Sequence, residues 1–183
     1  MSGLSPYYTL GCSQIVPAYN CNPCPTLEKG RVSSVAFIKP GFSFIDPTNP
    51  TEWVAAIEAG NVVMIPNTRG KFDGGTAKKA DGYGRALERF SNYEFKLSFN
   101  DLNFYPNAAF YDTIDKTTNW GMAFFTKTVL WIVNEAVTFT TKDEVTEDVE
   151  SDVVWVTECS WQSTHHPMKF TAPAGVQNCF QTA

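Results

Sequence analysis

The sequence has few charged residues, almost no histidine and no long apolar run. Only 18% of its 183 residues are charged, and 2 are histidines. Histidine is the commonest general acid or base, so candidates for such catalysis are few. No apolar run reaches the roughly 18 residues of a membrane helix, and the N-terminus lacks the basic and apolar segments of a secretory signal. We therefore expect no membrane partner, and synthesis in a cytoplasm.

The net charge of −5 argues against a broad electrostatic hold on nucleic acid. Such binding needs clustered lysine and arginine to neutralise phosphates. Aromatic residues are instead abundant, with 14 Phe, 7 Tyr and 5 Trp. Abundant aromatics with sparse charge suit a protein that buries surface against partners. The alternative is an ordinary aromatic-rich β core.

Recognisable catalytic motifs are also missing. The run from Gly74 to Lys79 lacks the spacing of a phosphate loop. His165 and His166 are adjacent, so in a strand they would point to opposite faces and could not easily share a metal ion. No nucleophile elbow, zinc-protease motif or calcium loop occurs. We predict that the protein is not an enzyme and holds no cofactor.

Five cysteines stand at positions 12, 21, 24, 159 and 179. Cys21 and Cys24 have the spacing of a metal knuckle or a redox pair, which makes them weak candidates for a metal site. A zinc knuckle would want a second close pair, and Pro23 and Pro25 make the segment irregular. Free or buried thiols, disulfides and structural zinc all stay open.

Alternation is the clearest pattern in the chain. Tyr93, Phe95, Leu97 and Phe99 occupy every second position between polar residues, which predicts a half-buried strand. Further strands are predicted at 31–39, 62–65, 120–127, 128–133, 137–141 and 153–161. The strand at 128–133 is apolar on both faces and is expected to be central and covered on both sides. Short turns without βαβ repeats predict a mainly β fold, an antiparallel sandwich or barrel.

One helix is strongly indicated at 50–59. Asn49 is a good N-cap, Pro50 suits the first helical position, and Glu52 completes the spacing of a capping box. Trp53, Val54 and Ile57 are expected to pack on the β core, and Gly60 to end the helix. A weaker helix is expected within 107–116.

The expected organisation is an N-terminal Cys/Pro-rich arm at 1–30, a β domain at 31–162 and a C-terminal tail at 163–183. Within the β domain, residues 66–86 carry five glycines and a cluster of cations. A stretch of this length and composition is unusual inside a compact domain. It predicts a glycine-rich, protruding loop that becomes ordered against a neighbour. The segment from Lys142 to Asp152 holds six acidic residues, which most simply predicts a solvated hairpin tip.

The segment from Gly84 to Asp101, with Arg85, Glu88, Arg89 and Asn92 before the alternating strand, and the later Leu130-Trp131-Ile132 carry a resemblance. Over about 84–133 the chain resembles virion structural proteins of Bacteroides-group tailed bacteriophages, including crAss-like phages. The resemblance implies a subunit repeated around a ring, in the tail tube or the head-to-tail connector. Expected partners are copies of itself and other virion proteins, with DNA passing transiently and without specific binding.

A ring subunit needs residues that contact its neighbours and residues that face the channel. The expected subunit contacts come from the arm and the glycine-rich loop: Tyr7, Tyr8, Ile15, Tyr19, Arg69, Lys71, Lys78 and Lys79. Acidic residues facing a channel would repel DNA phosphates. The candidates are Glu144, Glu147, Asp148 and Glu150. The alternative is a head-decoration or fibre-attachment β module whose exposed Trp and Tyr side chains bind protein or carbohydrate.

Overall fold

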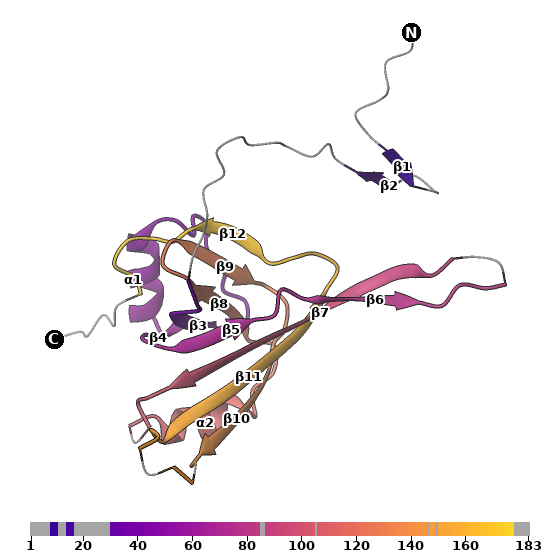
Figure 1. Cartoon of the computed structure of the whole chain (residues 1–183). Coiled ribbons are helices and arrows are strands. Elements are labelled where there is room, and N and C mark those ends of the chain that lie inside the picture. Colours follow the sequence, from indigo (N-terminus) through magenta and orange to yellow (C-terminus); the bar gives the residue numbers. More distant parts are fainter. Residues whose placement is uncertain are drawn as a thin grey trace.

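The computed structural model describes residues 8–10, 14–16, 30–84, 87–104, 106–145, 147–148 and 150–177. Near the N-terminus, β1 (Tyr8–Leu10) pairs antiparallel with β2 (Gln14–Val16). The other strands form two five-stranded antiparallel sheets that pack as a sandwich, without a closed barrel in the described part of the chain (Figure 1). The predicted mainly β, sandwich-like fold is confirmed.

The first sheet, called here the long-strand sheet, is built around β7 (Arg89–Asp101). Its order is β10 (Thr138–Glu144), β11 (Val154–Ser163), β7 and β5 (Arg69–Phe72), and β6 (Thr76–Ala80) also pairs with β7. The alternation predicted for β7 is confirmed. Phe95, Leu97 and Phe99 are buried between the sheets, while the intervening polar residues are exposed on the other face.

The second sheet, called here the helix-covered sheet, is buried on both faces at its central strands β9 (Val129–Val133), β8 (Gly121–Phe125) and β3 (Ser34–Ile38). Its order is β12 (Met168–Thr171), β9, β8, β3 and β4 (Val62–Ile65). On β9, Val133 faces the core between the sheets, and Leu130 and Ile132 belong to the cluster beneath α1. The predicted double cover of this strand is therefore confirmed.

Helix α1 (Pro50–Glu58) begins and ends largely as its sequence predicts. The Asn49 side chain accepts from the Thr51 N–H, and Pro50 is the first helical residue. Gly60 has a φ of 72°, and its N–H and that of Asn61 donate to the carbonyls of Ile57 and Ala56. This pattern is a Schellman motif, which needs a left-handed residue after the helix.

The prediction that Glu52 forms a capping box with the backbone N–H of Asn49 is wrong. The carboxylate accepts from the backbone N–H groups of Ile45, at 2.6 Å, and Asp46, at 2.9 Å, instead of that of Asn49. Asn49 already donates its N–H to the Asp46 carbonyl, at 3.1 Å, because the preceding chain forms a turn. Glu52 therefore fixes the loop before the helix to its first turn.

Trp53 is the centre of the cluster beneath α1 and is fully buried. Its ring stacks on Phe44, with centroids 4.2 Å apart, and its Nε1–H donates to the Pro47 carbonyl at 2.8 Å. Ala56 is buried and Ile57 packs at the edge of this cluster. Val54, predicted in the same stripe, is half-buried and lies outside the cluster, because the apolar stripe passes through positions 53, 56 and 57.

Helix α2 (Ala108–Ile114) lies within the region predicted at 107–116. Tyr111 and Ile114 are buried in the core between the sheets. The Tyr111 hydroxyl donates to the Asp101 carboxylate at 2.7 Å, and burial, with the carboxylate beside it, raises the pKa of Tyr111 well above its ordinary range. Tyr111 thus stays protonated and ties the helix to the end of β7.

The two sheets are joined along one side by a bend between β4 and β5. The Thr68 N–H donates to the Ser33 carbonyl, and Val32 and Gly70 exchange two backbone hydrogen bonds of 3.2 and 3.0 Å. Asn67 makes the bend with a φ of 58°. A Cβ at Gly70 would lie 2.9 Å from the Val32 Cβ and 3.1 Å from the Ser98 carbonyl oxygen, so only glycine fits where the sheets meet.

Two predicted boundaries need correction. The segment 66–86 was predicted as a loop, but it contains β5 and β6, because their pairing partner is the distant strand β7. The tail predicted from 163 onward contains β12, which pairs with β9, and Val176, which is fully buried. The Gln177 side chain also accepts a hydrogen bond from the Ser33 hydroxyl and donates one to the Thr126 carbonyl. The β domain therefore extends at least to residue 177.

Candidate assembly surfaces

The most prominent surface feature is a two-stranded projection, called here the ribbon, made of β6, the first half of β7 and the described residues between them, which include Tyr83 and Leu87. Pairing between β7 and β11 ends at Tyr93 and Ser163, and beyond it β7 pairs with β6 alone. At about 3.3 Å per residue, the strand from Ala77 to Ala80 alone extends by roughly 10 Å beyond the pairing of β7 with β11. Figure 1 shows the ribbon leaving the sandwich on the side away from α1. All five residues of β6 are exposed.

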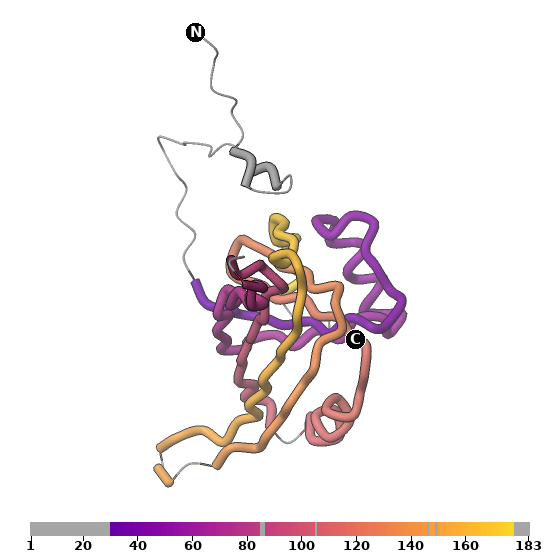
Figure 2. Tube along the Cα trace, turned by 90° about the vertical axis from the view of Figure 1, so that its right-hand side faces the viewer, coloured from indigo at the N-terminus to yellow at the C-terminus, as the bar shows by residue number. Residues whose placement is uncertain are grey.

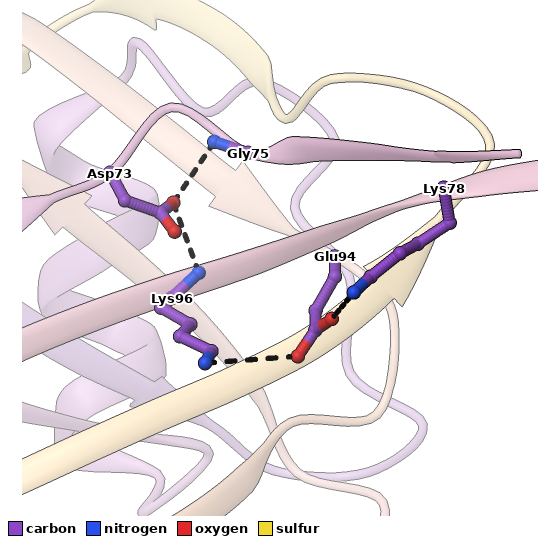
Figure 3. A network of polar contacts seen from close by, with 5 residues as sticks. All are labelled: Asp73, Gly75, Lys78, Glu94 and Lys96. Atoms are coloured by element: carbon purple, nitrogen blue, oxygen red, sulfur yellow. Dashed lines mark hydrogen bonds and ion pairs between the residues drawn. The ribbon is translucent and has the colours of Figure 1, made fainter.

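The ribbon is attached through a bulge at Asp73. Phe72 pairs with Leu97 and Thr76 with Glu94, so Asp73, Gly74 and Gly75 oppose only two residues of β7. The Asp73 carboxylate fills the resulting gap, accepting from the N–H groups of Gly75, at 2.9 Å, and Lys96, at 3.1 Å (Figure 3). Bulges increase the local twist of a strand pair, which redirects the ribbon from the sheet.

An aromatic series connects the ribbon to the core. The ring centroids of Tyr93 and Phe95 lie 5.7 Å apart, and those of Phe95 and Trp161 5.3 Å apart. The series continues through Phe72 to Phe124 on the helix-covered sheet. Such ring contacts stabilise beyond the area they bury, so the base of the ribbon is rigid although its far end is a bare strand pair.

Two of the cations predicted to contact a neighbour also form ion pairs within the ribbon, while their side chains stay exposed. Lys78 Nζ lies 2.9 Å from the Glu94 carboxylate, which Lys96 also approaches at 3.9 Å (Figure 3). Lys79 Nζ lies 3.9 Å from the Glu88 carboxylate. These pairs follow from the antiparallel register, which sets Lys78 and Lys79 among the first residues of β7. A neighbour would therefore meet each of these cations beside a carboxylate of the same subunit.

Arg69 and Lys71, the other two predicted contact cations, lie on β5 and are exposed. Arg69 lines a shallow pocket of about 320 Å³ with Leu102 and Asp152. Lys71 lines a groove of about 570 Å³ on the open face of the long-strand sheet, beside Lys96 and Glu158. Both cations are accessible, but neither is on the ribbon.

The ion pair between Lys78 and Glu94 at the base of the ribbon predicts a measurable shift in the pKa of Glu94. The hydrogen bond from Lys78, with its charge, holds the pKa of Glu94 below the ordinary 4.5. Because the folded pKa is depressed, the pair stabilises the fold above the unfolded pKa, and this contribution is lost as pH falls through the folded value. We expect Lys78→Met to raise the pKa of Glu94, measured by NMR, and Lys96→Met to raise it less. Equal effects of the two variants would contradict this assignment.

Large exposed apolar side chains gather in three places. Tyr83, Leu87 and Phe90 lie on the ribbon, and Ile45 and Met168 line one groove between the loop before α1 and β12. The third group lies at the end of the long-strand sheet distant from the ribbon: Leu102, Val145 and Val153. Single exposed apolar residues are ordinary on a surface, but clusters indicate contact surfaces. Sequence reasoning assigned no role to these residues, since nothing local distinguishes them from core positions.

The two outer edges of the long-strand sheet differ. On β10, the Thr141 N–H donates to one oxygen of the Asp115 carboxylate at 2.8 Å. The Thr141 hydroxyl donates to the other oxygen of the same carboxylate, also at 2.8 Å. A carboxylate bound to an edge N–H blocks the addition of a further strand there. The outer edge of β6 is exposed along its whole length. Among the described strands of this sheet, the outer edge of β6 is thus open to another strand, whereas the edge of β10 is blocked at Thr141.

The acidic residues predicted to face a channel lie at the tip of the hairpin between β10 and β11, which projects in orange at the lower left of Figure 2. Glu144, Glu147, Asp148 and Glu150 are all exposed. Asp148 also organises this turn, because its carboxylate accepts from the Glu150 N–H and the Ser151 hydroxyl. The structure thus supports the solvated hairpin tip, and the channel-facing role stays a prediction.

The N-terminal candidates are described only in part. Tyr8 lies in β1 and Ile15 in β2, while Tyr7, Tyr19, Cys21 and Cys24 lie outside the described residues. Among the residues that are described, no group of three potential ligands could hold a metal ion, and no helix is long and apolar enough to cross a membrane. Cys159 is a buried free thiol whose pKa is raised by burial.

Comparison with known protein families gives no match, and comparison with curated proteins gives none either. Among solved structures, the chain is similar to one chain in the cryo-EM structure of the anti-feeding prophage baseplate, symmetrised six-fold. The two are 11% identical with a TM-score of 0.35, over 80% of this chain and 97% of that chain. The resemblance to virion proteins of Bacteroides-group and crAss-like phages stays a prediction, so function is argued from the geometry of the chain itself.

Proposed function

We propose that this chain is a structural subunit of a phage virion that assembles with copies of itself into a ring or tube of the tail or head-to-tail connector. The observation that carries the proposal is the ribbon. It projects from a rigid base, leaves a strand edge unpaired and exposes Tyr83, Leu87 and Phe90. An isolated two-stranded ribbon is marginally stable in water, so one that also exposes apolar side chains is suited to a partner's surface.

A subunit with one reaching element and one blocked edge favours head-to-tail contacts. The ribbon leaves one side of the molecule, and Asp115 prevents simple edge pairing at β10. Heterologous contacts of this kind close into rings when the rotation between neighbours divides a full turn. The resemblance over 84–133 supports the placement of such a ring in a virion, and the protein would act by assembly without chemical turnover.

The acidic hairpin tip takes the channel-facing role in this proposal. Glu144, Glu147, Asp148 and Glu150 would repel the phosphates of DNA passing through the ring. The 1–30 arm would add to the subunit contact. The decoration or fibre-attachment alternative requires exposed Trp and Tyr side chains for stacking. All five tryptophans lie in the described part of the chain, and each is buried or half-buried. Tyr83 is 95% exposed, so the ribbon end is the one described place where that alternative could stack a ligand.

Removing the ribbon tests the proposal. Replacing residues 78–92 with Asn-Gly would join Ala77 and Tyr93, which are paired, by a two-residue turn suited to a hairpin. We expect a folded protein by circular dichroism that forms no rings or tubes by negative-stain microscopy. The matched control exchanges the four acidic residues of the hairpin tip for their amides and should assemble normally. Normal rings from the ribbon deletion would overturn the proposal.

A further inference from the structure

The loop before α1 forms one wall of an apolar groove of about 210 Å³. Phe42, Phe44 and Ile45 line it from the loop, and Ile132, Met168 and Phe170 line it from the helix-covered sheet. Ile45 is 96% exposed and Met168 50% exposed at its rim. The groove is therefore open to solvent while its walls are apolar.

The walls of this groove are held in place before any partner arrives. Phe42 and Phe44 meet edge to face at 5.1 Å, and Phe44 stacks on the buried Trp53. The Glu52 carboxylate accepts the backbone N–H of Ile45, so this side chain is presented on a fixed loop. A preformed apolar site loses little conformational entropy when a partner binds, so it binds more tightly than a site that must first become ordered.

The ribbon end provides side chains of matching character. Tyr83 is 95% exposed and Leu87 86% exposed. A single large anchor side chain seated in an apolar pocket is the common energetic centre of a protein–protein contact. One pair of opposite charges is also available. Glu88, next to Leu87, already pairs with Lys79 at 3.9 Å, Arg89 follows it, and on the other side Asp46 adjoins Ile45. The hydrogen bonds from Thr48 lower the pKa of Asp46, which keeps this carboxylate ionised.

The groove and the ribbon end of one molecule cannot meet. Figure 1 shows the ribbon projecting outward from the sandwich, whereas the groove lies on the sandwich itself, between the loop before α1 and the helix-covered sheet. The bulge at Asp73 and a second register shift between Lys78 and Lys79 set the course of the ribbon. We propose that the ribbon end of one copy, through Tyr83 and Leu87, docks in the Phe42–Phe44–Ile45 groove of a second copy. This inference rests on the proposed self-assembly and names the contact that produces it.

Cross-linking tests the contact directly. The full chain would carry the photoreactive residue p-benzoylphenylalanine in place of Tyr83, be assembled and irradiated, and its cross-linked peptides be identified by mass spectrometry. We expect intermolecular cross-links to residues 42–47 or 168–170. Cross-links to the third apolar group at Leu102, Val145 and Val153, or none between assembled copies, would overturn the docking site while leaving self-assembly intact.

Complementation tests it independently. The tip variant Tyr83→Ser with Leu87→Ser keeps its groove, and the groove variant Ile45→Ser with Met168→Ser keeps its ribbon. Each alone should raise the concentration needed for assembly about tenfold or more, as loss of a contact anchor does. Mixed together, they should form a pair with one intact contact and nothing longer.

The control Val145→Ser removes an equally exposed apolar side chain and should assemble like the unmodified chain. A groove variant that assembles normally beside a defective tip variant would overturn the groove and retain the ribbon as a contact. An unmodified chain that stays monomeric at every concentration would overturn both the docking and the proposed function.

Discussion

Replacing Trp53 with alanine is expected to lower the free energy of unfolding by about 3–5 kcal/mol. The side chain is fully buried beneath α1, its ring stacks on Phe44 and meets Phe125 at 5.2 Å, and its Nε1–H is satisfied by the Pro47 carbonyl. Truncation removes these contacts and leaves a cavity that neighbouring β strands cannot fill. Urea denaturation followed by circular dichroism measures the difference.

The matched control for Trp53 is Val54→Ala in the same helical turn. Val54 is half-buried and lies outside the cluster, so its loss should cost less than about 1 kcal/mol. A loss below about 1 kcal/mol for Trp53→Ala would mean that α1 is not part of the cooperative core.

Replacing Gly75 with alanine is expected to lower the free energy of unfolding by about 2–4 kcal/mol, from overpacking and left-handed strain together. A Cβ at this position would lie 2.3 Å from Cε1 and 2.5 Å from Cδ1 of Phe95, a fully buried ring. Gly75 also has a φ of 89°, which an L side chain tolerates poorly. Chain and ring cannot both keep their places, so the base of the ribbon should also become sensitive to protease.

The neighbouring Gly74 separates the two causes. Its φ of 77° is similar, but nothing lies within 4 Å of a Cβ built on it. Gly74→Ala should therefore show only the conformational cost, about 1–2 kcal/mol. If the two variants are equally stable, the close approach of Gly75 to Phe95 does not exist in solution.

Side-chain periodicity predicted the sandwich well where strands are half-buried or apolar throughout. The alternation at 93–99 and the apolar run at 129–133 each encode their own environment, so both were found. Strands β5 and β6 were missed because they are short and polar, and because Gly74 and Gly75 between them are typical of a loop. Their structure depends on β7, which no local pattern reveals.

The candidate contacts were predicted only coarsely, for a similar reason. A projection within 66–86 was expected from its glycines and cations, but the pairing of Lys78 with Glu94 and of Lys79 with Glu88 depends on the hairpin register, which no local pattern gives. Tyr83 and Leu87 read in the sequence as ordinary apolar residues, and only the three-dimensional arrangement shows them exposed. The partner of Glu52 was likewise hidden, since the capping-box spacing fits whether or not the bond forms.

The pairing of β7 has a consequence for the order in which the chain folds. Its inner half joins β11, some sixty residues later in the sequence, so the core cannot close until distant segments meet. Non-local pairing of this kind is slow, on the order of milliseconds to seconds. The ribbon is a local hairpin, and hairpins form in about 1–10 μs. We therefore expect the nascent chain to sample its assembly element long before the sandwich that holds it is complete.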